Sequence, residues 1–200
     1  MKLKMTFLLA AFAATSIFAQ DNLLKGSAFE TGNDVLAWAP GHWVHIGPAL
    51  GDYKKLLPQV SPYCKRMLVQ DAKSGRWSMK VVTDKEYHKI KDNKGGVIMV
   101  SNSLNQTVAV TPGKYKLTFW VKGKMEKVPG YNALRLFLIC TKQDKKTSQL
   151  LDHQFKLTDN WVQFQKEITV PAQGASLQIR FALYGVGEFQ IDDVTLEKVQ

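Results

Sequence analysis

FQIDDVTL, at residues 189–196, is the most informative segment of the chain. Its apolar residues alternate with polar ones, as they do on a β-strand with one buried face. The adjacent carboxylates of Asp192 and Asp193 interrupt that alternation. Adjacent acids on a half-buried strand carry a desolvation cost unless a cation or several hydrogen-bond donors compensate it. The segment therefore predicts a strand with a metal site or a hydrogen-bond anchor built into it.

PGKYKLTFWVKG, at residues 112–123, shows the same design of a turn followed by a strand with two different faces. Other short strands are separated by Gly, Pro, Asn and Asp, and this spacing predicts an all-β antiparallel sandwich or jelly roll. The expected strands are 78–83, 96–101, 107–110, 115–121, 133–141, 150–157, 162–170, 177–183 and 189–199. Residues 39–73 hold four prolines and little periodicity, which predicts a long ordered loop with a short helix near 53–57.

Residues 1–19 have the pattern of a secretory signal peptide. Lys2 and Lys4 precede a short apolar core at 5–14, and Ala19 supplies the small residue at the cleavage point. The apolar stretch is too short to span a membrane as a helix, and no second one follows it. We therefore expect an exported protein, periplasmic or extracellular, with residues 20–200 forming a single domain.

The formal net charge is +10, and removal of the two lysines of the signal peptide lowers it to +8. A basic surface favours anionic partners such as acidic polysaccharide, lipopolysaccharide phosphate or nucleic acid. Export argues against nucleic acid, and scattered lysines that keep the protein soluble are the simpler alternative. Export also permits a disulfide between Cys64 and Cys140, but the sequence leaves their pairing open.

Three strands divide into a core face and a second face, because side chains alternate along a strand. The second faces mix aromatic, guanidinium and amide groups, which stack on sugar rings and hydrogen-bond sugar hydroxyls. The predicted ligand-binding cluster is Trp120, Arg135, Gln178, Arg180 and Tyr184. The alternative is a sheet face covered by the long loop.

Trp38 and Trp43, in the long loop, are further candidates that either wall a groove or form the core of the loop itself. Trp77 and Trp161 are expected in the core. No nucleophile elbow, phosphate-binding loop or histidine metal spacing is present, so no catalytic residue is predicted. An acid pair for glycoside cleavage depends on three-dimensional geometry, and the sequence leaves it open.

Five motifs in order resemble the galactose-binding-like jelly rolls, and in particular the carbohydrate-binding modules of families 4, 9 and 22. The motifs are NLL with FE at 22–30, GRWSMKV at 75–81, PGKY leading into FWVK at 112–122, WVQF with TVP at 161–171, and IDDVTL at 191–196. The resemblance implies a two-sheet sandwich with a structural calcium held by Glu30 and Asp192, with Asp193 beside or in place of Asp192. Alternatively, Asp192 caps a turn and Glu30 pairs with a lysine.

The leading hypothesis is an exported, non-catalytic carbohydrate-binding protein that uses aromatic stacking and Arg/Gln hydrogen bonds. Its expected partner is a poly- or oligosaccharide, neutral or acidic, with separate glycan-degrading enzymes as further partners. Neither nucleic-acid binding nor membrane insertion is expected. The rival hypotheses are a glycan hydrolase or lyase on the same scaffold, and an adhesive or structural module of the cell envelope.

Overall fold

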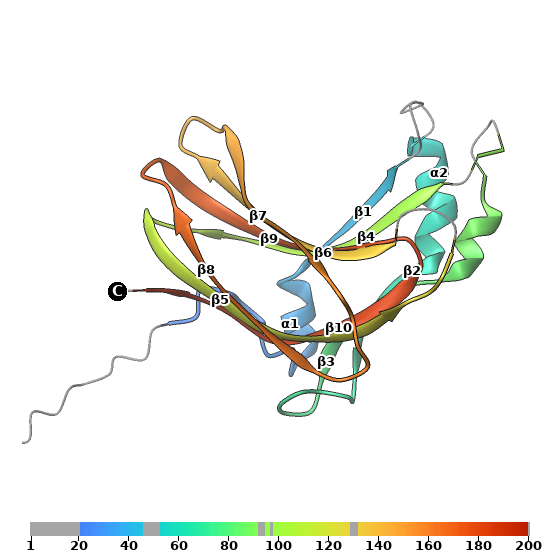
Figure 1. The fold of residues 1–200 in the computed structure, drawn as a ribbon, viewed down its shortest axis with the longest axis horizontal. Helices are drawn as coiled ribbons and strands as arrows, with labels where there is room; N and C mark the ends of the chain where they lie inside the picture. Colours follow the sequence, from blue (N-terminus) through green and yellow to red (C-terminus); the bar gives the residue numbers. More distant parts are fainter. Residues whose placement is uncertain (1–20, 46–52, 92–94, 97, 129–131, 200) are drawn as a thin grey trace, which may run out of the picture.

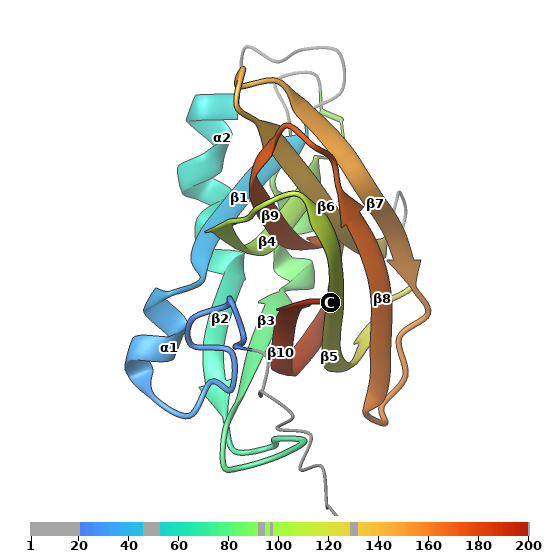
Figure 2. The same cartoon turned by 90° about the vertical axis from the view of Figure 1, so that its left-hand side faces the viewer.

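The computed structural model describes residues 21–45, 53–91, 95–96, 98–128 and 132–199. Two antiparallel five-stranded sheets stack face to face (Figure 1), and a view turned by 90° shows the same two layers (Figure 2). We call them sheet A, with strand order β1-β4-β9-β6-β7, and sheet B, with order β2-β3-β10-β5-β8. The predicted all-β sandwich is confirmed.

The strands of sheet A are β1 (Ala39–His45), β4 (Met99–Ala109), β6 (Ala133–Lys142), β7 (Thr147–Phe155) and β9 (Gly174–Tyr184). Those of sheet B are β2 (Cys64–Val69), β3 (Ser78–Thr83), β5 (Gly113–Met125), β8 (Val162–Val170) and β10 (Gly187–Lys198). The described residues also include two α-helices and two 3-10 helices: α1 (Gly32–Leu36), α2 (Tyr53–Val60), η2 (Ser61–Tyr63) and η3 (Lys85–Lys89).

The inner faces of the two sheets form the main core, because alternate residues of each central strand are apolar. Phe119 of β5 and Phe181 of β9 meet across the sandwich with ring centroids 4.9 Å apart in an edge-to-face arrangement. The fully buried inward residues include Leu117, Phe119, Leu134, Leu136, Leu138, Leu177, Ile179 and Phe181. A smaller cluster, comprising Leu56, Val60, Cys64, Tyr87, Ile98, Val100 and Val186, lies beside the main core.

The expectation of a long loop over residues 39–73 is wrong, because the region contains β1, α2 and β2. Both strands lie at the edge of a sheet and pair on one side only. An edge strand tolerates proline and carries weaker hydrophobic alternation than a central strand, so the sequence pattern concealed them. The expected short helix is confirmed and extends from Tyr53 to Val60.

The two expected strands at 96–101 and 107–110 form a single strand, β4. Its middle is polar and nevertheless buried, which concealed its continuity. Asn102, for example, accepts a hydrogen bond from Arg66 Nη2 at 2.8 Å and donates one to the Val82 carbonyl at 2.9 Å. Such partners offset the cost of burying an amide.

Cys64 and Cys140 are both buried and both free thiols. Burial raises the pKa of Cys64 to about 11, so this thiol stays protonated and unreactive at neutral pH. No helix in the described part of the chain is long and apolar enough to cross a membrane. The predicted signal peptide lies outside the described residues.

Candidate functional site

The outer face of sheet A brings together four of the five residues predicted to form one binding cluster. Inward residues of β6 and β9 alternate with outward Arg135, Gln178, Arg180 and Tyr184. Arg135 lies opposite Ala182, between the positions of Arg180 and Tyr184 on the neighbouring strand. The four residues therefore share one surface, as the alternation of their strands predicted.

Phe137 lies at the centre of this surface, opposite Arg180 on β9 and opposite Asp152 on β7. The Arg135 guanidinium carbon lies 4.9 Å from the centroid of the Phe137 ring, and that of Arg180 lies 5.8 Å away. Both distances are within the range of cation–π attraction. A half-buried aromatic ring is thus flanked by two planar groups with many hydrogen-bond donors.

Asp152 holds Arg135 in place. Arg135 Nε donates to Asp152 Oδ1 at 2.9 Å, and Arg135 Nη2 donates to Asp152 Oδ2 in a fork-like pair. The side chains of Arg135 and Asp152 remain 30% and 27% exposed, so both ends of the pair are accessible to a ligand. Gln149 also donates to Asp152 Oδ2 at 3.4 Å.

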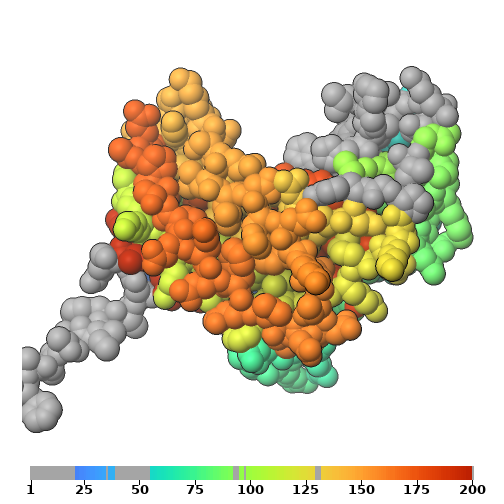
Figure 3. All heavy atoms as spheres, viewed as in Figure 1, coloured from blue at the N-terminus to red at the C-terminus, as the bar shows by residue number. Residues whose placement is uncertain are grey.

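Polar residues of β4 extend the surface, because Asn105 pairs with Arg180 and Thr107 pairs with Gln178. Asp152 is the single carboxylate carried by the five strands of sheet A. The sheet curves so that both ends of its outer face rise (Figure 1), and the space-filling view shows the molecule hollowed on that side, beside the β6–β7 hairpin (Figure 3). The arrangement offers one aromatic platform, two guanidiniums and several amides and hydroxyls on a concave face.

The position of Trp43 is known from the register of β1 alone. β1 pairs with β4 so that Trp43 lies opposite Ser101, and Ser101 lies opposite Tyr184. The side chain of Trp43 lies outside what the structure describes.

Trp120 does not belong to this cluster, and the expectation that it shares a surface with Arg135 and Arg180 is wrong. It does point away from the core, as predicted, but β5 belongs to sheet B, and Trp120 pairs with Asp192 and Gln163. Lys73 covers its ring, with Nζ 4.2 Å from the centroid. Alternation reveals which side of a strand is buried, but it does not reveal which sheet the strand joins.

Trp38 belongs to the main core and is not a groove wall. It is 2% exposed and packs between Phe29 and Phe181, with ring centroids 5.9 and 6.1 Å away. Its indole nitrogen donates to the Gly26 carbonyl at 3.2 Å, which satisfies the one polar atom of the side chain. Trp77 and Trp161, expected in the core, are half-buried.

The two predicted metal ligands clamp one loop, residues 70–77 between β2 and β3. Asp192 Oδ2 accepts hydrogen bonds from the backbone amides of Lys73 at 2.7 Å and Ser74 at 3.2 Å. Both oxygens of Glu30 accept from the backbone amide of Arg76, at 2.9 and 3.1 Å. The two carboxylates thus bind neighbouring turns of the same loop, and Asp192 caps its turn as the alternative interpretation expected.

Asp192 is fully buried, and burial raises the pKa of its carboxyl group above the ordinary value, opposed by the hydrogen bonds from Ser74 and Lys73. None of the ion pairs among the described residues includes Asp192 or Glu30. Among the described residues, Glu30 pairs with no lysine, and its carboxylate accepts hydrogen bonds from the Arg76 amide instead. Across the same residues, no three His, Cys, Asp or Glu side chains gather closely enough to hold a metal by themselves.

No protein-family model matches the sequence, and no curated protein matches it. Solved structures do resemble it. TmCBM61, solved in complex with β-1,4-galactotriose, has a TM-score of 0.55 at 16% identity, over 90% of this chain and 99% of that one. The CBM22-1 xylan-binding domain of Xyn10C from Paenibacillus barcinonensis has a TM-score of 0.55 at 15% identity, over 91% and 97%. The chain has the fold of carbohydrate-binding modules.

The enzymatically active domain of bacteriophage CBA120 tailspike protein 4 also shares this fold, with a TM-score of 0.59 at 13% identity. The match covers 89% of this chain and 21% of the tailspike chain, so the present chain spans about a fifth of that protein. At these identities the likeness is one of fold, and the same fold carries many functions.

Sequence reasoning missed Phe137 and Asp152 as members of the surface. For Phe137 the signal was present, because it follows Arg135 by two residues and so lies on the same side of the strand, opposite the core. Asp152 gave no such signal, because its proximity to Arg135 depends on the register of the β6–β7 hairpin and on a bulge between Leu138 and Ile139.

Proposed function

We propose that this protein is a non-catalytic carbohydrate-binding protein that holds an oligosaccharide across the outer face of sheet A. The observation that carries the proposal is the Phe137 ring flanked by the guanidiniums of Arg135 and Arg180 on a concave sheet face. The C–H face of a pyranose packs on an aromatic ring, and the surrounding hydroxyls require fork-like donors and acceptors.

The structural relatives support this proposal without settling the ligand. One of them is a module in complex with β-1,4-galactotriose, and another is a xylan-binding domain. Two arginines and one aspartate leave the outer surface of sheet A with an excess of positive charge. Both neutral and acidic oligosaccharides therefore belong in the test.

The small number of carboxylates on the strands of sheet A favours a binding function over glycoside hydrolysis. Glycoside cleavage ordinarily needs two carboxyl groups on either side of the scissile bond. The strands of sheet A carry one, Asp152, and it is engaged with Arg135. The rival hypothesis of a hydrolase or lyase is tested by product release from the same glycans, and sustained release by the purified protein would establish it.

The binding proposal is tested by titrating the protein with a panel of neutral and uronic-acid oligosaccharides in a calorimeter. For the best ligand, Phe137→Ala should weaken binding by about tenfold or more, since truncation of a central aromatic anchor costs more than 1 kcal/mol. Trp120→Ala removes an aromatic side chain from the opposite sheet and should leave the affinity unchanged. If Trp120→Ala weakened binding and Phe137→Ala did not, the binding surface would lie on sheet B. If no glycan of the panel bound, the proposal would be refuted.

We also propose a structural calcium ion at the loop of residues 70–77, with Glu30 and Asp192 as its carboxylate ligands and Asp193 as a further candidate. The donor set fits this ion, because carboxylate and backbone carbonyl oxygens are the ligands that calcium prefers. Asp192 is a buried carboxylate outside every ion pair of the described residues, and a bound cation would compensate its charge. The ion would supply charge compensation and rigidity for the loop.

The calcium proposal is tested by thermal unfolding of the chelator-treated protein with and without added calcium. Binding at a concentration of 100 times Kd should add about 2.7 kcal/mol to the free energy of unfolding. Asp192→Asn and Glu30→Gln should reduce that gain, whereas Asp144→Asn at the exposed β6–β7 turn should not. An unfolding temperature that does not respond to calcium would leave the carboxylates as hydrogen-bond anchors only.

We further propose that the protein is exported, because residues 2–19 combine two lysines, an apolar core and a small residue at the cleavage point. Mass spectrometry of the protein recovered outside the cytoplasm should find Gln20 as its first residue. Recovery of the intact chain in the cytoplasm would contradict this.

A further inference from the structure

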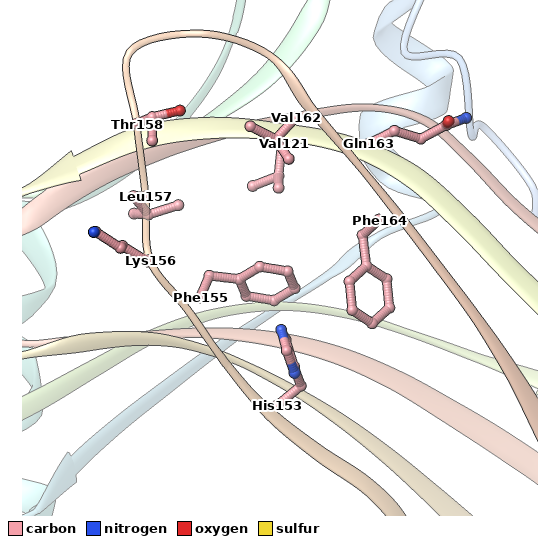
Figure 4. Close-up of a pocket in the computed structure, with 9 residues that line it drawn as sticks. All are labelled: Val121, His153, Phe155, Lys156, Leu157, Thr158, Val162, Gln163 and Phe164. Carbon is pink, nitrogen blue, oxygen red and sulfur yellow. The ribbon is translucent and has the colours of Figure 1, made fainter.

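A cavity opens where the edge strands of the two sheets face each other, β7 of sheet A and β8 of sheet B (Figure 4). Its volume is about 220 Å³, and its lining comes from β7, the segment that leads into β8, β8 itself and Val121 of β5. It lies between the sheets at the open edge of the sandwich, and not on the outer face of sheet A. An inference about this cavity therefore stands apart from the proposed glycan site.

Three rings converge at one end of the cavity: His153 and Phe155 from β7, and Phe164 from β8 (Figure 4). The centroids of Phe155 and Phe164 are 5.3 Å apart at an interplanar angle of 68°. The imidazole of His153 lies 4.7 Å from Phe155 and 5.0 Å from Phe164. Phe119 of the main core packs behind both phenylalanines, with its centroid 5.8 Å from Phe155 and 4.9 Å from Phe164, and the cavity lies beside this group of rings.

The other end of the cavity is aliphatic, formed by Val121, Leu157 and Val162. The ammonium of Lys156 and the amide of Gln163 point away from the centre in Figure 4. The lining is therefore mainly apolar, and a ligand with polar groups on every side would leave several of them without partners. This disfavours a bare pyranose.

His153 is the polar side chain that lies among the aromatic rings of the cavity. Within the described part of the chain, its imidazole makes ring contacts but no hydrogen bond to another residue. One ring nitrogen is directed toward the space between the two phenylalanines (Figure 4). A ligand hydroxyl placed there would give the nitrogen the partner that it lacks in the protein.

We propose that this cavity binds one phenolic ring, which packs against Phe155 and Phe164 and places its hydroxyl against His153. An apolar cavity of about 150 Å³ accepts benzene, so the present cavity has room for a ring with a substituent. It is smaller than the roughly 300 Å³ or more of sites for drug-sized ligands. A phenol matches both the mainly apolar walls and the imidazole that lies among the rings.

The experiment is a titration of the full chain with p-cresol, toluene and methyl β-glucoside, followed by NMR. p-Cresol should bind saturably and shift signals of Phe155, Phe164 and Val121. His153→Leu should lower the affinity for p-cresol about five- to tenfold, which is the equivalent of one hydrogen bond of about 1 kcal/mol. The affinity for toluene should not change. Leu36→Ala, which removes a similar apolar side chain that is 81% exposed on α1, should change neither affinity.

A second variant guards against misfolding. Val162 is 50% exposed at the mouth, so Val162→Phe should fill the cavity without disturbing the core and abolish binding of both aromatic ligands. Absence of saturable p-cresol binding, p-cresol affinity that survives Val162→Phe, or methyl β-glucoside binding as tightly as p-cresol would each overturn the inference.

Discussion

Arg135 is held at the outer face of sheet A by two neighbours with different chemistry, the Phe137 ring beneath it and the Asp152 carboxylate beside it. Because the side chain is fixed before a ligand arrives, little entropy is lost when its remaining donors are used. Preorganisation of this kind is what allows a shallow surface to bind a sugar chain with useful affinity.

Arg135→Met should therefore separate stability from binding. The ion pair is about a third exposed, so its loss should lower the free energy of unfolding by about 1 kcal/mol or less. Glycan affinity should fall about ten- to a hundredfold, because hydrogen bonds to charged groups contribute about 1.5–3 kcal/mol. Denaturant unfolding and calorimetry measure the two effects. A variant that unfolds readily but binds normally when folded would show that Arg135 is structural.

Asp192 shows at the same scale how burial of one carboxylate makes stability depend on pH. Because burial raises its pKa, the native state binds this proton more tightly than the unfolded chain does. In chelator-treated protein, the wild type should lose stability relative to Asp192→Asn as the pH rises from about 4 to about 7. Denaturant unfolding at several pH values measures the difference. A difference that is constant over this range, or that favours the wild type at higher pH, would contradict the argument.

The loop of residues 70–77 is the element that depends most on such anchors. Glycine at position 75 has φ of +62°, and a Cβ there would lie 2.0 Å from Glu30 Oε1. The backbone at Gly75 therefore lies in direct contact with the Glu30 carboxylate, which accepts a hydrogen bond from the Arg76 amide. Only a residue without a side chain combines that backbone conformation with that close approach.

Gly75→Ala should destabilise the protein by about 2 kcal/mol, since the left-handed conformation costs an L-residue about 1–2 kcal/mol and the Glu30 carboxylate must move. For a domain of this size, thermal unfolding should shift by about 4–8 °C. The matched control is Gly32→Ala in α1, where a Cβ would meet nothing within 4 Å and no loss of stability is expected. Equal unfolding temperatures for the two variants would show that the loop adapts freely.

Strands were the elements that the sequence predicted best, and their assignment to sheets was what it predicted least. β3 and β8 begin and end at the expected residues, because apolar alternation and turn residues mark them clearly. The placement of Trp120 failed, because β5 and β6 follow each other along the chain but belong to different sheets. That assignment depends on pairings between residues far apart in sequence, such as Trp120 with Asp192.

Across the whole molecule, hydrogen bonds join the N-terminal segment to β10, the last strand of the chain. Asn22 accepts a hydrogen bond from the backbone amide of Leu196 at 2.9 Å and donates to the carbonyl of Val194 at 3.1 Å. The motifs at 22–30 and 191–196 and the loop of residues 70–77 thus meet in space, although their sequence positions reveal only their order. Resemblance to a known fold allows these long-range contacts to be expected, whereas the alternation of apolar residues within each strand does not.

The central claim is that sugars bind on the outer face of sheet A. The most direct measurement is an NMR titration of isotope-labelled protein with the best oligosaccharide of the panel, followed at backbone amides and arginine side chains. The claim predicts shifts concentrated at Arg135, Phe137 and Arg180, with little change around Trp120. Shifts confined to the surroundings of Trp120, or no shifts with any glycan, would contradict it.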